Sequence, residues 1–394
     1  MTAIEKPPLG ILALATGTPV IGITLITPAL PIIAGEFSAS NTYVQLLLTM
    51  YLAMLAAGQL IFGPLSDLFG RRRFLLLGAV VYALSALAGL FVQDIFWLTT
   101  CRTVQGLGAA ASLSMARAII NDAYEKQEAT KAMATVQMIQ AIMPILALIT
   151  GGLMVEFMGW QSVLACMSAL GITTIFTGYF LVKETHLNRS GRLDLGLIAT
   201  GYGAVFSNIT FLTFMCISAI QIGTFFSMNG FLPYRYEQLG ISSASFGLYF
   251  ALTPFFYLIG NSLNRAYFHK NPERSVAIGT GLCFTSIILL LITQSSGVES
   301  PFGIALPCAL FGFSSGMVIA NATIRGISAV SSYAGTASGL IGAMQMMSGG
   351  VIGFAIVATG GAQNINVAIV ILLVLTGCST TLSILRYRVS RVAA

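Results

Sequence analysis

The chain has 394 residues, of which 56% are hydrophobic and only 8% are charged, and its mean hydropathy is +0.87. A soluble protein carries about a quarter charged residues, so this composition excludes a soluble globular domain and indicates a membrane protein. The net charge of +6 is spread over short links rather than gathered in one patch, which excludes a nucleic-acid-binding protein.

Apolar runs of about 20 residues, the length that crosses a bilayer, occur between polar breaks along the whole chain. They predict an all-α integral membrane protein with twelve transmembrane helices. The first run is too long for a cleaved signal peptide, so we count it as a helix. The predicted spans are 8–33, 42–65, 74–93, 96–120, 130–156, 160–182, 204–235, 243–266, 275–294, 302–325, 334–359 and 364–386.

Lysine and arginine fall mainly in every second link between these runs. Basic links stay on the cytoplasmic side of a membrane, so we expect both termini in the cytoplasm and the protein in the inner membrane of the cell. The longest polar stretch, Val182–Asp194, separates six predicted helices from six. The basic turns Gly63–Arg73 and Gly260–Arg274 follow the second helix of each half, which predicts two six-helix lobes related as a repeat. The predicted lobes and the cytoplasmic linker between them are 1–182, 204–394 and 183–203.

The stretch GPLSDLFGRRR gathers turn residues and charge between two apolar runs. Gly63 and Pro64 are expected to end the second helix, and Gly70 to permit a tight turn before the third. The arginines anchor this end of the bundle in the cytoplasm. Asp67 has no topological role, so we expect it to pair with Arg71 or to accept hydrogen bonds from a helix N-terminus. Such contacts, made in one conformation and lost in another, would act as a gate.

This stretch resembles the G-x-L-a-D-r-x-G-r-r/k signature between helices 2 and 3 of the major facilitator superfamily. A second phrase, RTVQGLGAA, resembles the helix 4 signature of the same family. The phrases ARAIINDAY, KET and AGTASGLIGAMQ resemble the Bcr/CflA branch of drug efflux pumps. The residues that match the two signatures are Gly63, Leu65, Asp67, Gly70, Arg71 and Arg72, then Arg102, Gln105 and Gly106. The resemblance implies the major facilitator fold, alternating access, and a charge relay of Asp67, Arg71 and Asp122 that closes the cytoplasmic side.

Two departures from the pattern of this branch bear on whether transport is coupled to protons. Its drug antiporters usually carry an Asp in helix 1, where this chain has Thr24 in ITLITPALP. The helix 5 signature G-P-x-x-G-G appears as ALITGG, which keeps Gly151 and Gly152, while Pro144 lies one turn earlier and could still bend the helix. None of the 13 acidic residues lies at the middle of a predicted span. The usual proton-binding residue of a proton-coupled transporter is therefore missing.

Polar residues inside the predicted spans are the remaining candidates. Arg102 could cap helix carbonyls, pack between helices or touch substrate, and Arg117 is expected to reach the interface, near Asp122. Amide and hydroxyl side chains are unfavourable in hydrocarbon unless they bond across helices or meet a substrate. The candidate substrate contacts are Thr24, Tyr51, Gln137, Gln140, Asn229, Tyr249, Asn321 and Gln345.

The favoured interpretation is a monomeric inner-membrane transporter that exports small amphipathic drugs or metabolites, with proton exchange as one option for its coupling. An alternative is a membrane-potential-driven exporter of an anionic metabolite such as a carboxylate siderophore. A third, of another class, is a non-transporting membrane sensor or assembly partner. The sequence holds no enzyme-like constellation, its six cysteines lie inside apolar runs, and we expect no metal and no cofactor. The expected partners are a small-molecule substrate and membrane lipids.

Overall fold

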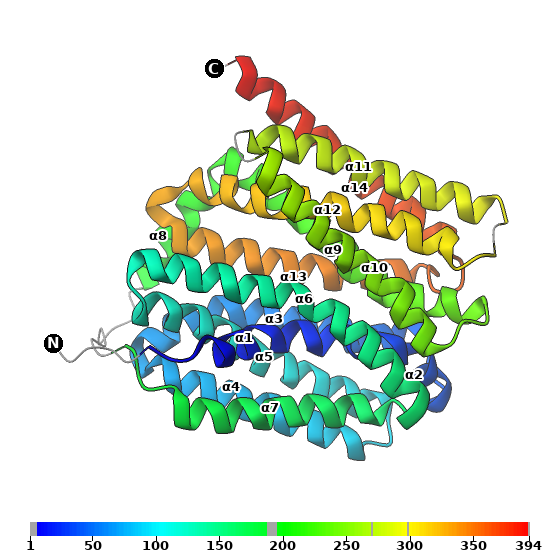
Figure 1. Ribbon diagram of the computed structural model, residues 1–394, viewed down its shortest axis with the longest axis horizontal. Helices are drawn as coiled ribbons and strands as arrows, with labels where there is room; N and C mark the ends of the chain where they lie inside the picture. Colours follow the sequence, from blue (N-terminus) through cyan, green and yellow to red (C-terminus); the bar gives the residue numbers. More distant parts are fainter. Residues whose placement is uncertain (1–5, 187–194, 269–270, 298, 393–394) are drawn as a thin grey trace. The chain divides into compact units, whose positions relative to one another are not determined.

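The computed structural model describes residues 6–186, 195–268, 271–297 and 299–392, and these residues are almost entirely helical. Two compact units divide the chain between Asp194 and Leu195, inside the predicted linker 183–203. Each unit consists of long helices that run side by side over much of their length (Figure 1).

The first unit contains seven α-helices among the described residues. Their bounds are α1 Leu9–Thr24, α2 Leu30–Glu36, α3 Asn41–Phe69, α4 Arg71–Ala88, α5 Ile95–Ala123, α6 Lys126–Met158 and α7 Gln161–Leu181. Polar side chains begin two of them, because the first amides of a helix lack partners inside it. The Ser40 hydroxyl accepts from the Tyr43 amide at the start of α3, and the Asp94 carboxylate accepts from the Phe96 amide at the start of α5.

The second unit contains seven further α-helices in the described part of the chain. Their bounds are α8 Leu195–Phe206, α9 Ile209–Gln238, α10 Ser243–Leu263, α11 Pro272–Ser295, α12 Phe302–Ser328, α13 Ala334–Ala358 and α14 Ile365–Val392. The short α8 occupies the second half of the predicted linker and packs against α13. Asn208 and Ser242 begin α9 and α10 in the same way as Ser40 begins α3.

The two units repeat one pattern of neighbours. In the first, α5 packs against α1, α3 and α4, and α4 packs against α7; in the second, α12 packs against α9, α10 and α11, and α11 packs against α14. The most enclosed helices, α1 and α12, bury most of the residues in their apolar stretches, whereas α6 and α14 bury about a third of theirs. Large apolar side chains such as Phe157 and Phe180 point outward. Such exposed apolar surface is what a lipid-facing helix requires.

Eleven helical segments of the described chain are long and apolar enough to span a membrane. They account for every predicted span except 96–120, which forms α5. This helix has 29 residues, ample length for a span, but its composition is more polar. It is also wrapped by α1, α3 and α4, so its side chains need less lipid compatibility. Its assignment as a twelfth span therefore stays a prediction.

Two proline positions differ from expectation. The first predicted span, 8–33, is interrupted: α1 ends at Thr24, a short 3-10 turn covers Thr27–Ala29, and α2 follows. Pro28 explains this break, since its ring conflicts with the carbonyl four residues earlier and it has no amide hydrogen to donate. In contrast, the expectation that Gly63 and Pro64 end the second helix is wrong. There α3 continues through both residues to Phe69.

Candidate functional site

The turn between α3 and α4 is made by one glycine. Gly70 has φ +100°, a backbone conformation that L side chains rarely adopt. The chain thereby reverses in a single residue, and Arg71 becomes the first residue of α4. The turn lies at Gly70, where the sequence predicts a tight turn, and not at Gly63, seven residues earlier, whose own surroundings are open.

Arg71 is the centre of a polar cluster at this turn. Its Nε donates to the Asp122 Oδ2 near the end of α5 at 3.0 Å, and its Nη1 donates to the Ser66 hydroxyl in α3. The Thr185 hydroxyl lies 3.5 Å from the same Asp122 oxygen, and Glu184 accepts from the Arg71 backbone amide at 2.9 Å. We name these five residues the Arg71 cluster. The cluster joins α3, α4, α5 and the segment after α7.

Burial makes the Arg71–Asp122 ion pair more than a surface contact. The two side chains are 11% and 23% exposed, so water screens their attraction less than it does for an exposed pair. Asp67, the third member of the relay that the resemblance implies, lies in the last turn of α3. Its side chain is outside the part of the chain that the structure describes.

Two other arginines near the cluster have different surroundings. Arg72 donates to the Tyr179 carbonyl at 2.6 Å and lies over the Tyr179 ring, so it fastens α4 to the end of α7. Arg117 does not pair with Asp122 in the described structure, contrary to expectation. The two residues are five apart on one helix, whereas side chains meet at spacings of three or four.

Arg102 lies about two turns into α5 and is 1% exposed. Its Nη2 donates to the Gly22 carbonyl in the last turn of α1, and its Nη1 donates to the Gln105 side chain. Its guanidinium also lies 4.4 Å from the centre of the Tyr51 ring, a cation–π contact. The last carbonyls of a helix lack donors inside it and carry partial negative charge. Of the three roles considered for Arg102, the geometry favours capping, here at the point where α1 breaks.

Two glycines of the helix 4 and helix 5 signatures permit close backbone approaches, one to α3 and one to the break after α1. A Cβ on Gly106 of α5 would meet the Tyr51 carbonyl of α3, and a Cβ on Gly151 of α6 would meet the Leu25 carbonyl just after α1. Both glycines therefore permit contacts that no larger residue allows without movement. Gly152 and Pro144 are also buried within α6. Arg102 of the helix 4 signature and Gly151 of the helix 5 signature thus both contact the interrupted part of the first helix.

Three of the candidate substrate contacts in the first unit bond to α1 carbonyls. Thr24 is fully buried and donates to the Val20 carbonyl, and Tyr51 is fully buried and donates to the Pro19 carbonyl. Gln140 donates to the Thr16 carbonyl at 3.2 Å. These bonds fasten α3 and α6 to α1 and give Thr24 and Tyr51 structural partners.

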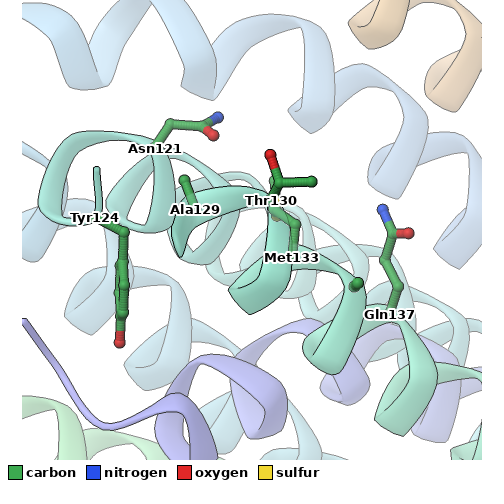
Figure 2. Close-up of a pocket in the computed structure, with 7 residues that line it drawn as sticks. Asn121, Tyr124, Ala129, Thr130, Met133 and Gln137 are labelled. Carbon is green, nitrogen blue, oxygen red and sulfur yellow. The ribbon is translucent and has the colours of Figure 1, made fainter. Parts of the chain in front are cut away.

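Gln137 lies instead in an open pocket of about 590 Å³ formed by the end of α5 and the first turns of α6. The pocket is lined by Asn121, Tyr124, Ala129, Thr130, Met133, Ala134 and Gln137. Figure 2 shows the Asn121 and Gln137 amides and the Thr130 hydroxyl on one side of these helices, with the Tyr124 ring turned the other way. The Tyr124 hydroxyl donates to the Pro7 carbonyl at 2.6 Å. None of these seven described side chains is charged, so this part of the lining suits an uncharged polar or amphipathic ligand.

The second unit holds the other four candidates. Asn321 donates to Asn264 at 2.9 Å, Asn229 donates to the Phe225 carbonyl, and Gln345 donates to Thr323. Tyr249 lies between the rings of Tyr236 and Phe302.

An ion pair joins Glu273 at the start of α11 to Arg325 near the end of α12. The helices involved correspond to α4 and α5, but the charges are exchanged relative to Arg71 and Asp122.

Sequence reasoning did not find Glu184 or Asn264. Glu184 was seen only as part of the KET phrase, which carried no role, because nothing in the local sequence links it to the turn at Gly70, more than a hundred residues away. Within the described residues, no group of three His, Cys, Asp or Glu side chains could hold a metal ion.

The comparisons with known proteins agree with this fold. The family model of the major facilitator superfamily matches residues 12–354. A bicyclomycin resistance protein homolog of Haemophilus influenzae is 27% identical over 88% of this chain and 86% of its own length. The multidrug resistance protein MdtL of Salmonella dublin is 27% identical over 94% and 91%.

Two solved structures share the fold at low identity. A mutant of the nucleoside transporter NupG has a TM-score of 0.73 at 12% identity over 97% of this chain and 98% of its own. A bacterial homolog of the human lysosomal transporter Spinster, in an inward-facing and unoccupied conformation, has a TM-score of 0.69 at 15% identity over 96% of each chain. The chain is therefore a multi-pass membrane transporter, not an enzyme, and belongs to the major facilitator superfamily.

Proposed function

We propose that this transporter exports small, uncharged or weakly charged amphipathic molecules across the inner membrane by alternating access. The observation that carries the proposal is the Arg71 cluster, in which a nearly buried ion pair joins the ends of α4 and α5 at the family signature. The names of the relatives, a bicyclomycin resistance protein homolog and a multidrug resistance protein, support drug-like substrates and efflux. Both termini and the Arg71 cluster are proposed to lie on the cytoplasmic side.

The Arg71 cluster is proposed to be the gate. Gly70 supplies the turn, and Asp67, Arg71 and Asp122 supply the charges, whereas Gly63 lies inside α3 and is kept only as a member of the signature. The ion pair is proposed to be made in one conformation and broken in the other. A contact drives such a change only through its different strength in the two states. A buried pair suits this role because breaking it exposes both charges to water, which offsets part of the lost attraction.

The pocket at the start of α6 is the proposed route for substrate in the first unit. The seven described lining residues, Gln137 among them, offer amides and apolar surface. Gln140, Asn229, Tyr249, Asn321 and Gln345 remain proposed contacts. For Thr24 and Tyr51 we propose a structural role instead, since both are fully buried against α1.

Nothing supports a coupling of transport to protons through an acidic side chain in the middle of a helix. Each acidic residue of the described chain lies in a link or within about two turns of a helix end, as Asp122, Glu156 and Glu237 do. Proton exchange would then use a group near the membrane surface. The anion-export alternative is weakened because Arg102 is buried and already bonded to the protein.

The test is transport in liposomes with the pH gradient and the electrical potential imposed separately. A neutral amphipathic dye, the cation ethidium and the anion citrate serve as probes. We expect the wild type to move the dye and the R71A variant, reconstituted in equal amount, to be at least tenfold slower. Movement of citrate driven by the potential alone would favour the anion exporter, and no movement of any probe would favour the sensor. The same experiment on monodisperse protein tests whether the monomer suffices.

A further inference from the structure

Three backbone amides converge on one carboxylate oxygen beside the first turn of α4. The Glu184 Oε1 accepts from the amides of Arg71 at 2.9 Å, Thr185 at 3.1 Å and His186 at 3.1 Å. Glu184 follows α7 by three residues, and 113 positions separate it from Arg71. The carboxylate therefore reaches α4 from a distant part of the chain.

The start of α4 needs such an acceptor. Its N-cap residue is Gly70, which has no side chain to bond the first amides. In addition, α4 begins with Arg71, Arg72 and Arg73, although the N-terminus of a helix already carries partial positive charge. Asp122 lies near the C-terminus of α5, where a negative charge is also unfavourable. The attraction between Arg71 and Asp122 thus acts against two helix dipoles.

We propose that the Glu184 side chain caps the N-terminus of α4 in place of a side chain at Gly70, and that Glu184 is a positioning residue for the gate. It supplies the acceptor that Gly70 lacks and the negative charge that the first turn lacks, and so holds Arg71 where its side chain reaches Asp122. Thr185, the next residue, adds a contact to the same Asp122 oxygen. The part of this inference that concerns the gate rests on the proposed function; the cap does not.

The space around the carboxylate fits this role. A Cβ at position 70 would displace the Glu184 carboxylate, so a larger residue there would disturb the cap, while the positive φ by itself favours glycine. Because residues 184–186 immediately precede the segment that leads into the second unit, the cap also fastens the start of that segment to the gate.

Hydrogen exchange of the purified full-length protein tests the cap. Loss of a helix cap costs about 0.5–2 kcal/mol, which corresponds to an increase in exchange of about twofold to thirtyfold for the Arg71 amide, the α4 amide that Glu184 accepts from. We expect this increase in E184A and a smaller one in E184Q, which keeps an acceptor oxygen and loses the charge. E125A is the matched control, since Glu125 is an exposed acid at the start of α6 that makes no capping bond. Unchanged exchange in E184A would overturn the cap.

Transport of the neutral dye tests the positioning role. We expect E184A to lower the maximal rate at least fivefold with little change in the half-saturating concentration, and to add nothing further in an R71A background, because both residues act through one contact. Additive losses, or full transport by E184A, would overturn the positioning role. If the wild type moves no probe, the proposed function fails, while the exchange result still decides the cap.

Discussion

Arg102 offers the sharpest stability prediction, since every contact it makes lies within the first unit. The R102A change removes the donor of the buried Gly22 carbonyl at the end of α1. A buried polar group left unpaired costs about 1–3 kcal/mol. The contact with the Tyr51 ring contributes about 2 kcal/mol when it is shielded from water. We therefore expect R102A to lower the free energy of unfolding by about 3–5 kcal/mol.

A thermal scan of the purified protein measures this loss. In a domain of the size of the first unit, a loss of 1 kcal/mol in the free energy of unfolding lowers the Tm by about 2–4 °C. R102A should therefore lower the Tm by about 6–20 °C. R102K should lower it less, because a lysine keeps the charge but loses the forked geometry that reaches two acceptors. R117A is the matched control, as Arg117 is half-buried on the same helix. The smallest Tm shift expected from a loss of 1 kcal/mol is about 2 °C. If R102A loses transport while its Tm stays within about 2 °C of wild type, capping is refuted and Arg102 is assigned to the substrate.

The remaining predictions concern packing and the other polar contacts. G106V should abolish the monodisperse peak in size-exclusion chromatography because a Cβ there meets the Tyr51 carbonyl, whereas G63A, whose Cβ would have open space, should leave it unchanged. R325A should lower the Tm by less than about 4 °C, since the ion pair with Glu273 is partly exposed and such pairs contribute about 0–1 kcal/mol. Trp160 donates to Glu36 at 2.5 Å, so in a W97F background, where it is the single tryptophan, E36A should shift its fluorescence emission and Glu128→Ala should not.

The sequence predicted the helices well because a membrane span is a local property of composition. Proline effects were predicted less well, since they depend on neighbours. Pro28 is followed by Pro31, so two amide donors are missing within one turn and α1 breaks. Pro64 stands alone, so α3 loses one donor and continues to Phe69.

The candidate site was predictable only in part for a related reason. The signature pointed to Arg71 and Asp122, and the structure places them 3.0 Å apart. Nothing local distinguishes Glu184 from any other acid after a span, because its role depends on the missing side chain of Gly70, more than a hundred residues away. Arg102 was ambiguous in the sequence since its acceptor is a backbone carbonyl, and residue identities do not encode which carbonyls a helix break leaves exposed.

The position of Arg102 also bears on which substrates are accepted. A cation in a dry bundle must be compensated, and here a helix C-terminus, an amide and an aromatic ring do so in place of a carboxylate. This charge is therefore not available to attract an anion, and no acid of the described chain lies in the middle of a helix to attract a cation. The contacts proposed for recognition are uncharged amides, hydroxyls and rings, such as Gln137 in the first unit and Tyr249 in the second. Dipoles of this kind select less strongly by charge than fixed ions do, so we expect the transporter to accept several neutral amphipathic molecules of different shape.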